Sequence, residues 1–315
     1  MRKALFSFLE QIAEHDENVY LMVGDLGFSY IEKFKEKYPK QFLNAGIAEQ
    51  NMIGMAAGMA MMGKRVYIYS IIPFTTMRCF EQIRNNLCYP PLPVTIIGFG
   101  GGFSYGAQGV THQAFEDISI MRTLPEMTII NPGCLQEVAP LAMQAYCISS
   151  PCYMRLSAIE ATLPADMLVG LQPKLGNALE IIPSNNYCIV TTGNSLDLGY
   201  QVHKKLAESG LYMGLVNMHT IKPLDTDFFK TKKYKAVFTI EEHFLNGGLG
   251  EALAFYFCQE HHSNIIFHAF GIDDFYIYEA GNRAWLNQQA GLSVDVVANT
   301  IKQKLLAAQP TSISF

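Results

Sequence analysis

Residues 44–72 read NAGIAEQNMIGMAAGMAMMGKRVYIYSII, in which a helical pattern is followed directly by a β-rich run. The segment from Ile47 to Met62 is apolar on all sides, so we expect a helix that is buried in its own domain or against another subunit. Arg65 to Ile72 predicts a strand. Other strand-like runs, each separated from the next by a helix-length segment, are Val19–Val23, Pro93–Gly98, Met127–Asn131 and Cys152–Leu156. This alternation predicts a parallel sheet with helical crossovers, one of which spans 75–87.

The second half of the chain repeats this alternation after an interruption. The periodicity is weak from Ser157 to Ser184, and a second series of strands and helices begins at Tyr187 and includes a strand at 264–268. A chain of 315 residues is long enough for two hydrophobic cores. We therefore predict two α/β domains: a parallel-sheet domain at 1–160, a linker at 161–184 and a smaller domain at 185–315.

The composition excludes several classes of protein. A formal net charge of −5 and an isoelectric point near 5.9 provide no basic surface, so nucleic acid is not an expected partner. The longest apolar stretches are interrupted before the ~20 residues that a membrane span needs, and Glu10 and Glu14 do not fit a secretory signal. We expect a cytoplasmic protein with no membrane contact. Its seven cysteines lack zinc spacing and are expected to be reduced and buried.

Three places combine ionisable side chains with apolar or glycine-rich surroundings, where pKa values are most easily shifted. Glu49 stands at the opening of the apolar helix, where an unpaired carboxylate is costly. His112 follows the glycine-dense loop 98–109. Loops of this type expose side chains at a cleft. The third place is 241–243, Glu-Glu-His, before a glycine-rich turn. Helix capping and turn formation are the alternative role for this last segment.

Several segments resemble the transketolase family. Residues 44–58 resemble the glutamate motif of transketolases and 1-deoxyxylulose-5-phosphate synthases. Residues 109–117, GVTHQAFED, continued by 121–132, are similar to the substrate-histidine segment of these families, and 239–250 are similar to their C-terminal domain. The resemblance covers nearly the whole chain. It implies the fold of a thiamine-diphosphate pyrimidine-binding domain followed by a transketolase C-terminal domain.

The resemblance also implies roles for individual residues. Glu49 would hydrogen-bond N1′ of the cofactor's aminopyrimidine and so favour the imino tautomer, whose 4′-nitrogen removes the thiazolium proton. Phe74 falls near the aromatic residue that stacks on the pyrimidine, although a plain core phenylalanine is the alternative there. Ile47 is assigned to the same cofactor site. The protein positions the cofactor, and the cofactor stores the carbanion.

Substrate contacts are assigned to His112, Gln108 and Arg78. His112 would exchange protons with a hydroxyl group, and Gln108 replaces an acidic residue that contacts a sugar hydroxyl in transketolases. Arg155 matches an arginine that family members acting on phosphorylated sugars carry in this strand, but Ala158 stands at the position that binds phosphate in them. We therefore expect a neutral or otherwise modified acceptor, unless Arg78 or Arg122 substitutes.

The resemblance implies a partner as well. Family members carry a diphosphate-binding domain with a Gly-Asp-Gly segment that holds Mg²⁺, and this sequence has no such segment. The string Gly24-Asp-Leu-Gly27 belongs to the first strand region and is assigned no metal. We expect the magnesium and diphosphate sites on a second, N-terminal transketolase-type subunit, in an α2β2 assembly with self-association.

We therefore predict a thiamine-diphosphate-dependent subunit of a split transketolase, which moves a two-carbon ketol unit from a ketose to an aldehyde. The alternatives are the β subunit of a 2-oxo-acid dehydrogenase and a carboligase similar to 1-deoxyxylulose-5-phosphate synthase. A subunit without catalytic function is a further alternative, against which the presence of both Glu49 and His112 argues.

Overall fold

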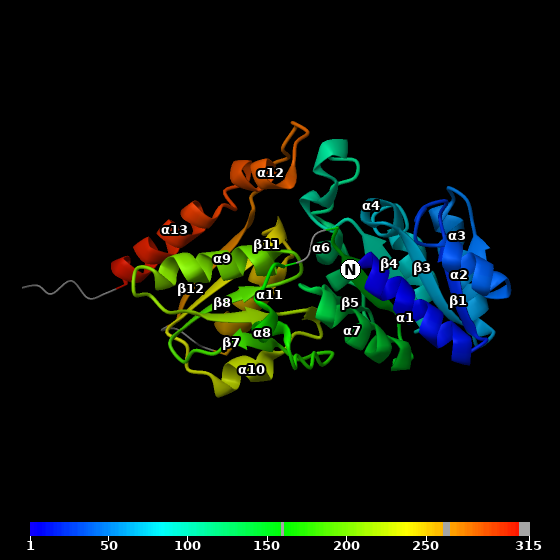
Figure 1. Ribbon diagram of the computed structural model, residues 1–315, viewed down its shortest axis with the longest axis horizontal. Coiled ribbons are helices and arrows are strands. Elements are labelled where there is room, and N and C mark those ends of the chain that lie inside the picture. Colours follow the sequence, from blue (N-terminus) through cyan, green and yellow to red (C-terminus); the bar gives the residue numbers. More distant parts are fainter. Residues whose placement is uncertain (159–160, 261–264, 309–315) are drawn as a thin grey trace, which may run out of the picture.

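The chain forms two α/β domains that lie side by side (Figure 1). The computed structural model describes residues 1–158, 161–260 and 265–308. The ends of the predicted domains at 159–160 and 309–315, and residue 264 at the start of a predicted strand, lie outside these ranges. The predicted fold of two α/β domains is confirmed by the two separate sheets.

The first sheet has seven strands in the order β10–β5–β6–β4–β3–β1–β2. All pair in parallel except β10, which is antiparallel to β5. Their bounds are β1 Val19–Val23, β2 Phe42–Asn44, β3 Arg65–Ile71, β4 Val94–Phe99, β5 Thr128–Ile130, β6 Cys152–Leu156 and β10 Thr220–Lys222.

Helices cover both faces of this sheet, which explains why its strands read as continuous apolar runs. α1 (Arg2–His15) and α7 (Leu135–Cys147) pack on the face that carries Tyr67 and Tyr69. α3 (Glu49–Met61) packs on the opposite face with Val66 and Ile68. The shorter helical segments are α2 Glu32–Lys37, η1 Pro39–Gln41, α4 Ile72–Thr75, α5 Phe80–Ile83, η2 Arg84–Cys88, η3 Phe103–Gln108 and α6 Asp117–Arg122.

The predicted helix 75–87 is wrong as a single element, because it is divided into α4, α5 and the π-helical turn η2. The hydroxyl of Thr76 donates to the Ile72 oxygen at 2.7 Å, and that of Thr75 donates to the Ile71 oxygen at 3.3 Å. Such back-bonding competes with the helical ladder. The interruption leaves Phe74 in the short helix α4 and Arg78 on the turn that follows it, after β3.

The second sheet has the order β12–β11–β8–β9–β7, with β7 antiparallel to β9. α9 and α13 pack on one face and α10 and α11 on the other. The strands are β7 Leu179–Ile182, β8 Tyr187–Thr191, β9 Gly214–Asn217, β11 Ala236–Phe244 and β12 Ile266–Ile272. The helices are α8 Ala165–Leu168, α9 Ser195–Ala207, α10 Thr226–Thr231, α11 Leu249–Gln259, α12 Arg283–Gln289 and α13 Val294–Ala307.

Two features cross the predicted domain limits. Strand β7 lies in the predicted linker 161–184 but pairs within the second sheet. Strand β10 follows β9 in the second half of the chain but pairs with β5 of the first sheet. Lys222 at its end donates to the backbone oxygen of Arg122 at 3.0 Å. The domain limits 1–160 and 185–315 remain a prediction. Because β10 from the second half of the chain pairs with β5, it connects the two domains.

All seven cysteines are free thiols, as predicted. Five are buried, but Cys147 and Cys258 are exposed, so the prediction of burial is wrong for these two. Both stand in the last turn of a helix, α7 and α11 respectively, where the helix surface faces solvent.

Candidate active site

Glu49 lies at the carboxyl edge of the first sheet, as the first residue of α3, and is only 2% exposed. The side-chain oxygen of Asn44, at the end of β2, accepts from the backbone N–H groups of Asp25 and Gly46 at 3.0 Å each. The Asn44 amide also donates to the Asp25 carboxylate at 3.0 Å. Gly46 has a φ of 71°, which favours glycine. The ends of β1 and β2 thus fix the carboxylate at a helix N-terminus, where the helix dipole stabilises negative charge.

Arg78 pairs with this carboxylate. Its Nη1 donates to Glu49 Oε2 at 2.7 Å, and its guanidinium carbon lies 4.5 Å from the centroid of the Phe74 ring. The side chain of Gln50 donates to the backbone oxygen of Arg78 at 3.0 Å. Because the Arg78 side chain is 44% exposed, the ion pair is buried on the glutamate side and open to solvent on the arginine side.

The Phe74 ring connects this ion pair to His112. The centroids of these two rings are 5.4 Å apart with their planes at 72°, and the ring of Tyr105 lies 6.1 Å from that of His112. The hydroxyl oxygen of Thr111 lies 2.9 Å from His112 Nδ1. The structure therefore brings four predicted site residues into one continuous group, which we call the edge cluster: Glu49, Phe74, Arg78 and His112.

The second domain positions the loop that carries His112. Glu242 on β11 accepts a hydrogen bond from the Phe103 N–H at 2.6 Å, and a Cβ atom on Gly102 would overlap with the same carboxylate. The Gly281 N–H donates to the Gly106 oxygen at 3.4 Å, beside α12. Figure 1 shows η3 at the top of the junction between the domains, next to α12. Contacts from the second domain therefore hold the glycine-dense loop in place.

The remaining predicted site residues lie around the edge cluster. Ile47 is 79% exposed in the turn before α3, and Gln108 is exposed at the end of η3. Both are accessible to a ligand or to a second chain. Sequence reasoning does not single out Cys79, whose Sγ donates to the Phe74 oxygen at 3.1 Å. Burial, together with the nearby Glu49 charge, raises the pKa of the Cys79 thiol to about 12, so this thiol is neutral at physiological pH.

Two arginines considered for a substrate phosphate are used elsewhere. Arg155 is 1% exposed and its Nε donates to Asp117 at 2.8 Å. Arg122 donates to the backbone oxygens of Gly247 and of Gly248, the latter at 3.0 Å. Carbonyl groups of the second domain thus hold Nη1 of Arg122, and the use of this arginine as an anion contact stays a prediction.

The segment 241–243 has a structural role. The Glu241 carboxylate accepts from the N–H groups of Leu249 and Gly250 at 2.7 Å each, at the start of α11, which confirms helix capping. Burial raises the pKa of Glu241 to about 7. Burial also lowers the pKa of His243 to about 4, so this imidazole is neutral at physiological pH. Its Nδ1 lies 2.7 Å from the Phe244 oxygen.

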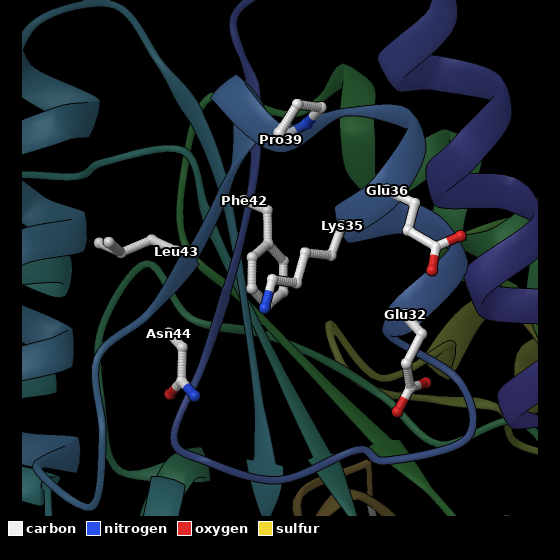
Figure 2. A pocket seen from close by; sticks show the side chains of 7 residues that line it. All are labelled: Glu32, Lys35, Glu36, Pro39, Phe42, Leu43 and Asn44. Carbon is white, nitrogen blue, oxygen red and sulfur yellow. The ribbon is translucent and has the colours of Figure 1, made fainter.

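A separate hollow with a volume of about 620 Å³ lies beside β2. Figure 2 shows the Lys35 side chain lying across the Phe42 ring, and its nitrogen is 6.0 Å from the ring centroid. The lining residues are Glu32, Lys35, Glu36, Pro39, Phe42, Leu43 and Asn44. Since this set includes no member of the edge cluster, the hollow is distinct from the candidate active site.

Within the described ranges, no group of three or more His, Cys, Asp or Glu side chains is placed to hold a metal ion. In that same part of the chain, no helix is long and apolar enough to cross a membrane.

The edge cluster suits a flat ring that carries nitrogen. Arg78 already places a planar group with N–H donors over the Phe74 ring and against the Glu49 carboxylate. An aminopyrimidine is also planar, stacks on an aromatic face and presents a ring nitrogen to a carboxylate. The residues present therefore fit the pyrimidine of thiamine diphosphate.

Two family models match the chain. Residues 1–162 match the transketolase pyrimidine binding domain, and residues 176–297 match the transketolase C-terminal domain. These matches define a chain of a thiamine-diphosphate enzyme that carries the pyrimidine binding domain and the C-terminal domain of a transketolase. The chain belongs to the transketolase family.

Relatives and a solved structure agree with this membership. A transketolase C-terminal section from Methanocaldococcus jannaschii is 34% identical over 81% of this chain and 80% of its own length. One subunit of an apulose-4-phosphate transketolase from Phocaeicola vulgatus is 30% identical over 79% of this chain and 80% of its own length. A split-gene transketolase, solved as an inactive β4 tetramer, has a TM-score of 0.86 and 28% identity, covering 98% of this chain and 99% of that one. The chain is thus a transferase subunit of the split transketolase type, which the matches favour over the predicted alternatives.

Proposed function

We propose that this chain supplies the pyrimidine-binding half of an active site that moves a two-carbon ketol unit from a ketose to an aldehyde acceptor. The observation that carries the proposal is the edge cluster, which joins a buried carboxylate, an aromatic ring and a histidine in a chain of the transketolase family. When bound, thiamine diphosphate supplies a carbon that can hold the electron pair of the ketol unit.

Different residues of this chain transfer protons, pack against the cofactor and contact the substrate. Glu49 shares a proton with N1′ of the aminopyrimidine, and its burial at 2% exposure keeps water away from that proton. Phe74 and Ile47 pack against the pyrimidine. His112, half-buried beside Phe74, holds or moves a proton at a substrate hydroxyl. Gln108 and Arg78 contact the sugar.

The second half of the site is assigned to a partner. We place Mg²⁺ and the diphosphate on an N-terminal transketolase-type subunit, because the sequence contains no Gly-Asp-Gly segment. The apulose-4-phosphate transketolase relative is itself one subunit of a divided enzyme and matches this chain over 80% of its own length, which supports this division. The assembly we propose is an α2β2 heterotetramer in the cytoplasm, in which this chain also associates with a second copy of itself.

The charge of the acceptor depends on which arginines are accessible to it. Arg155 is 1% exposed and bonded to Asp117, so among the three arginines considered a phosphate group could reach Arg78 or the partly exposed Arg122. The apulose enzyme is named for a phosphorylated sugar. A panel of neutral and phosphorylated aldehydes decides this point. A clear preference for phosphorylated sugars contradicts the neutral acceptor.

The test of the function is ketol transfer by this chain mixed with its diphosphate-binding partner, thiamine diphosphate and Mg²⁺. Glu49→Ala should lower turnover by roughly 10²–10⁴-fold, because proton transfer by a positioned acid contributes about that much. Glu81→Ala, at an exposed glutamate on α5, is the matched control and should retain turnover. Full turnover in Glu49→Ala, or reaction of 2-oxo acids in place of ketoses, contradicts the proposal.

A further inference from the structure

Arg78 contacts both groups that the proposed function assigns to the cofactor. Its Nη1 lies 2.7 Å from Glu49 Oε2, and its guanidinium carbon lies 4.5 Å from the centroid of Phe74. These two contacts use the carboxylate oxygen and the ring face at the same time. A pyrimidine that stacks on Phe74 and bonds to Glu49 needs the same space.

The guanidinium group resembles the aminopyrimidine in the features that matter for this site. Both are planar, both stack on aromatic faces, and both present N–H or ring-nitrogen groups in the plane. Arg78 thus gives the Glu49 carboxylate, which is only 2% exposed, a hydrogen-bond donor at the helix N-terminus.

The Arg78 side chain can also rotate away from Glu49 and Phe74 into solvent. Its backbone oxygen is anchored to α3 by the Gln50 amide at 3.0 Å, whereas the side chain is 44% exposed and borders solvent. Both contacts that hold the guanidinium are weak. A partly exposed ion pair and an exposed cation–π contact each change an equilibrium constant by at most about fivefold. Rotation of one side chain therefore vacates the space without any movement of α3.

We propose that Arg78 is a place-holder for the aminopyrimidine, which the entering cofactor displaces from Glu49 and Phe74. This inference rests on the proposed function. In the cofactor-free chain the guanidinium keeps the carboxylate paired and the ring covered. Cofactor binding releases the guanidinium, which a substrate can then meet.

The test is the dissociation constant of thiamine diphosphate, measured by calorimetry with Mg²⁺ on the complex of this chain and its diphosphate-binding partner. Arg78→Met keeps the length of the side chain and removes both contacts, so cofactor binding no longer has to break them. The dissociation constant should fall by about 3–30-fold. Arg84→Met is the matched control, since Arg84 is an exposed arginine on the next turn that bonds to Asn85, and it should leave the constant unchanged.

A second variant protects the test against misfolding. Arg78→Lys keeps the charge but loses the planar stacking, so it should tighten binding by a smaller factor. An unchanged or larger dissociation constant in both variants overturns the inference and leaves the proposed function intact. If Glu49→Ala binds the cofactor as tightly as the wild type does, the proposed function fails, and the inference fails with it.

Discussion

Two of the arginine–carboxylate pairs in the described part of the chain are nearly equal in length but lie in very different surroundings. Glu49 and Arg78 are 2.7 Å apart, with side-chain exposures of 2% and 44%. Asp117 and Arg155 are 2.8 Å apart, with exposures of 0% and 1%. The first pair borders solvent at the carboxyl edge of the sheet, and the second is sealed between the domains. The difference indicates that exposure, rather than pair chemistry, separates an ion pair that a ligand can open from one that holds the fold.

The sealed pair is satisfied on every side. Asp117 also accepts from the Tyr153 hydroxyl at 2.7 Å, and Arg155 donates to the backbone oxygens of Ala114 at 2.9 Å and Glu242 at 3.2 Å. Burial acts to raise the pKa of Asp117, but the Arg155 charge holds it below its ordinary value. Because one of these contacts reaches β11, the pair links the two domains.

The largest effect that the comparison predicts is on stability. Arg155→Met leaves the Asp117 carboxylate buried without its cation, so the free energy of unfolding should fall by about 4 kcal/mol. Denaturant unfolding followed by circular dichroism measures this loss. A loss below about 1 kcal/mol contradicts the structural role of the sealed pair.

Arg78→Met is the matched variant for the open pair. It should lower the free energy of unfolding by about 1 kcal/mol or less, because the arginine borders solvent and Glu49 keeps the favourable helix N-terminus. Equal losses of unfolding free energy in Arg78→Met and Arg155→Met contradict the difference between the open pair and the sealed pair.

An effect of intermediate size should appear in the pH dependence of stability. Glu137 accepts two hydrogen bonds from Asn217, at 2.7 and 2.9 Å, and one from the Gly133 N–H at 2.7 Å. Burial nevertheless raises the pKa of Glu137 from 4.5 to about 7. The folded chain thus binds this proton more tightly than the unfolded chain does. Its contribution to stability is complete below about pH 4.5 and is lost as pH rises toward about 7.

Glu137→Gln removes this titration. Between pH 5 and pH 8, the difference in unfolding free energy between variant and wild type should move by about 2 kcal/mol in favour of the variant. Denaturant unfolding at both pH values provides the measurement, with Glu208→Gln at an exposed helix end as the control. A difference that does not change with pH contradicts the raised pKa.

Much of the fold follows from the sequence because its signals are local. The alternation of strands and helices predicts both sheets, and the apolar character of β3 reflects helices on both of its faces. The assignment of β10 to the first sheet could not be predicted, because it depends on pairing between residues about 90 positions apart. The division of helix 75–87 depends on hydroxyl bonds of Thr75 and Thr76, which the apolar pattern hides.

The candidate site follows the same rule. The resemblance points to Glu49, Phe74 and His112, and the structure brings them together. The pairing of Arg78 with Glu49 joins residues on two different elements, so no spacing rule reveals it. The use of Arg122 by carbonyl groups of the second domain is equally hidden, since it depends on how the domains dock.

The most direct test of the account is thiamine diphosphate binding with Mg²⁺, measured by calorimetry on this chain alone and on its mixture with the diphosphate-binding partner. We expect tight binding to the mixture only, weakened by Glu49→Ala, because this chain carries the pyrimidine half of the site and the partner carries the diphosphate half. Binding to the isolated chain as tight as binding to the mixture contradicts the divided site.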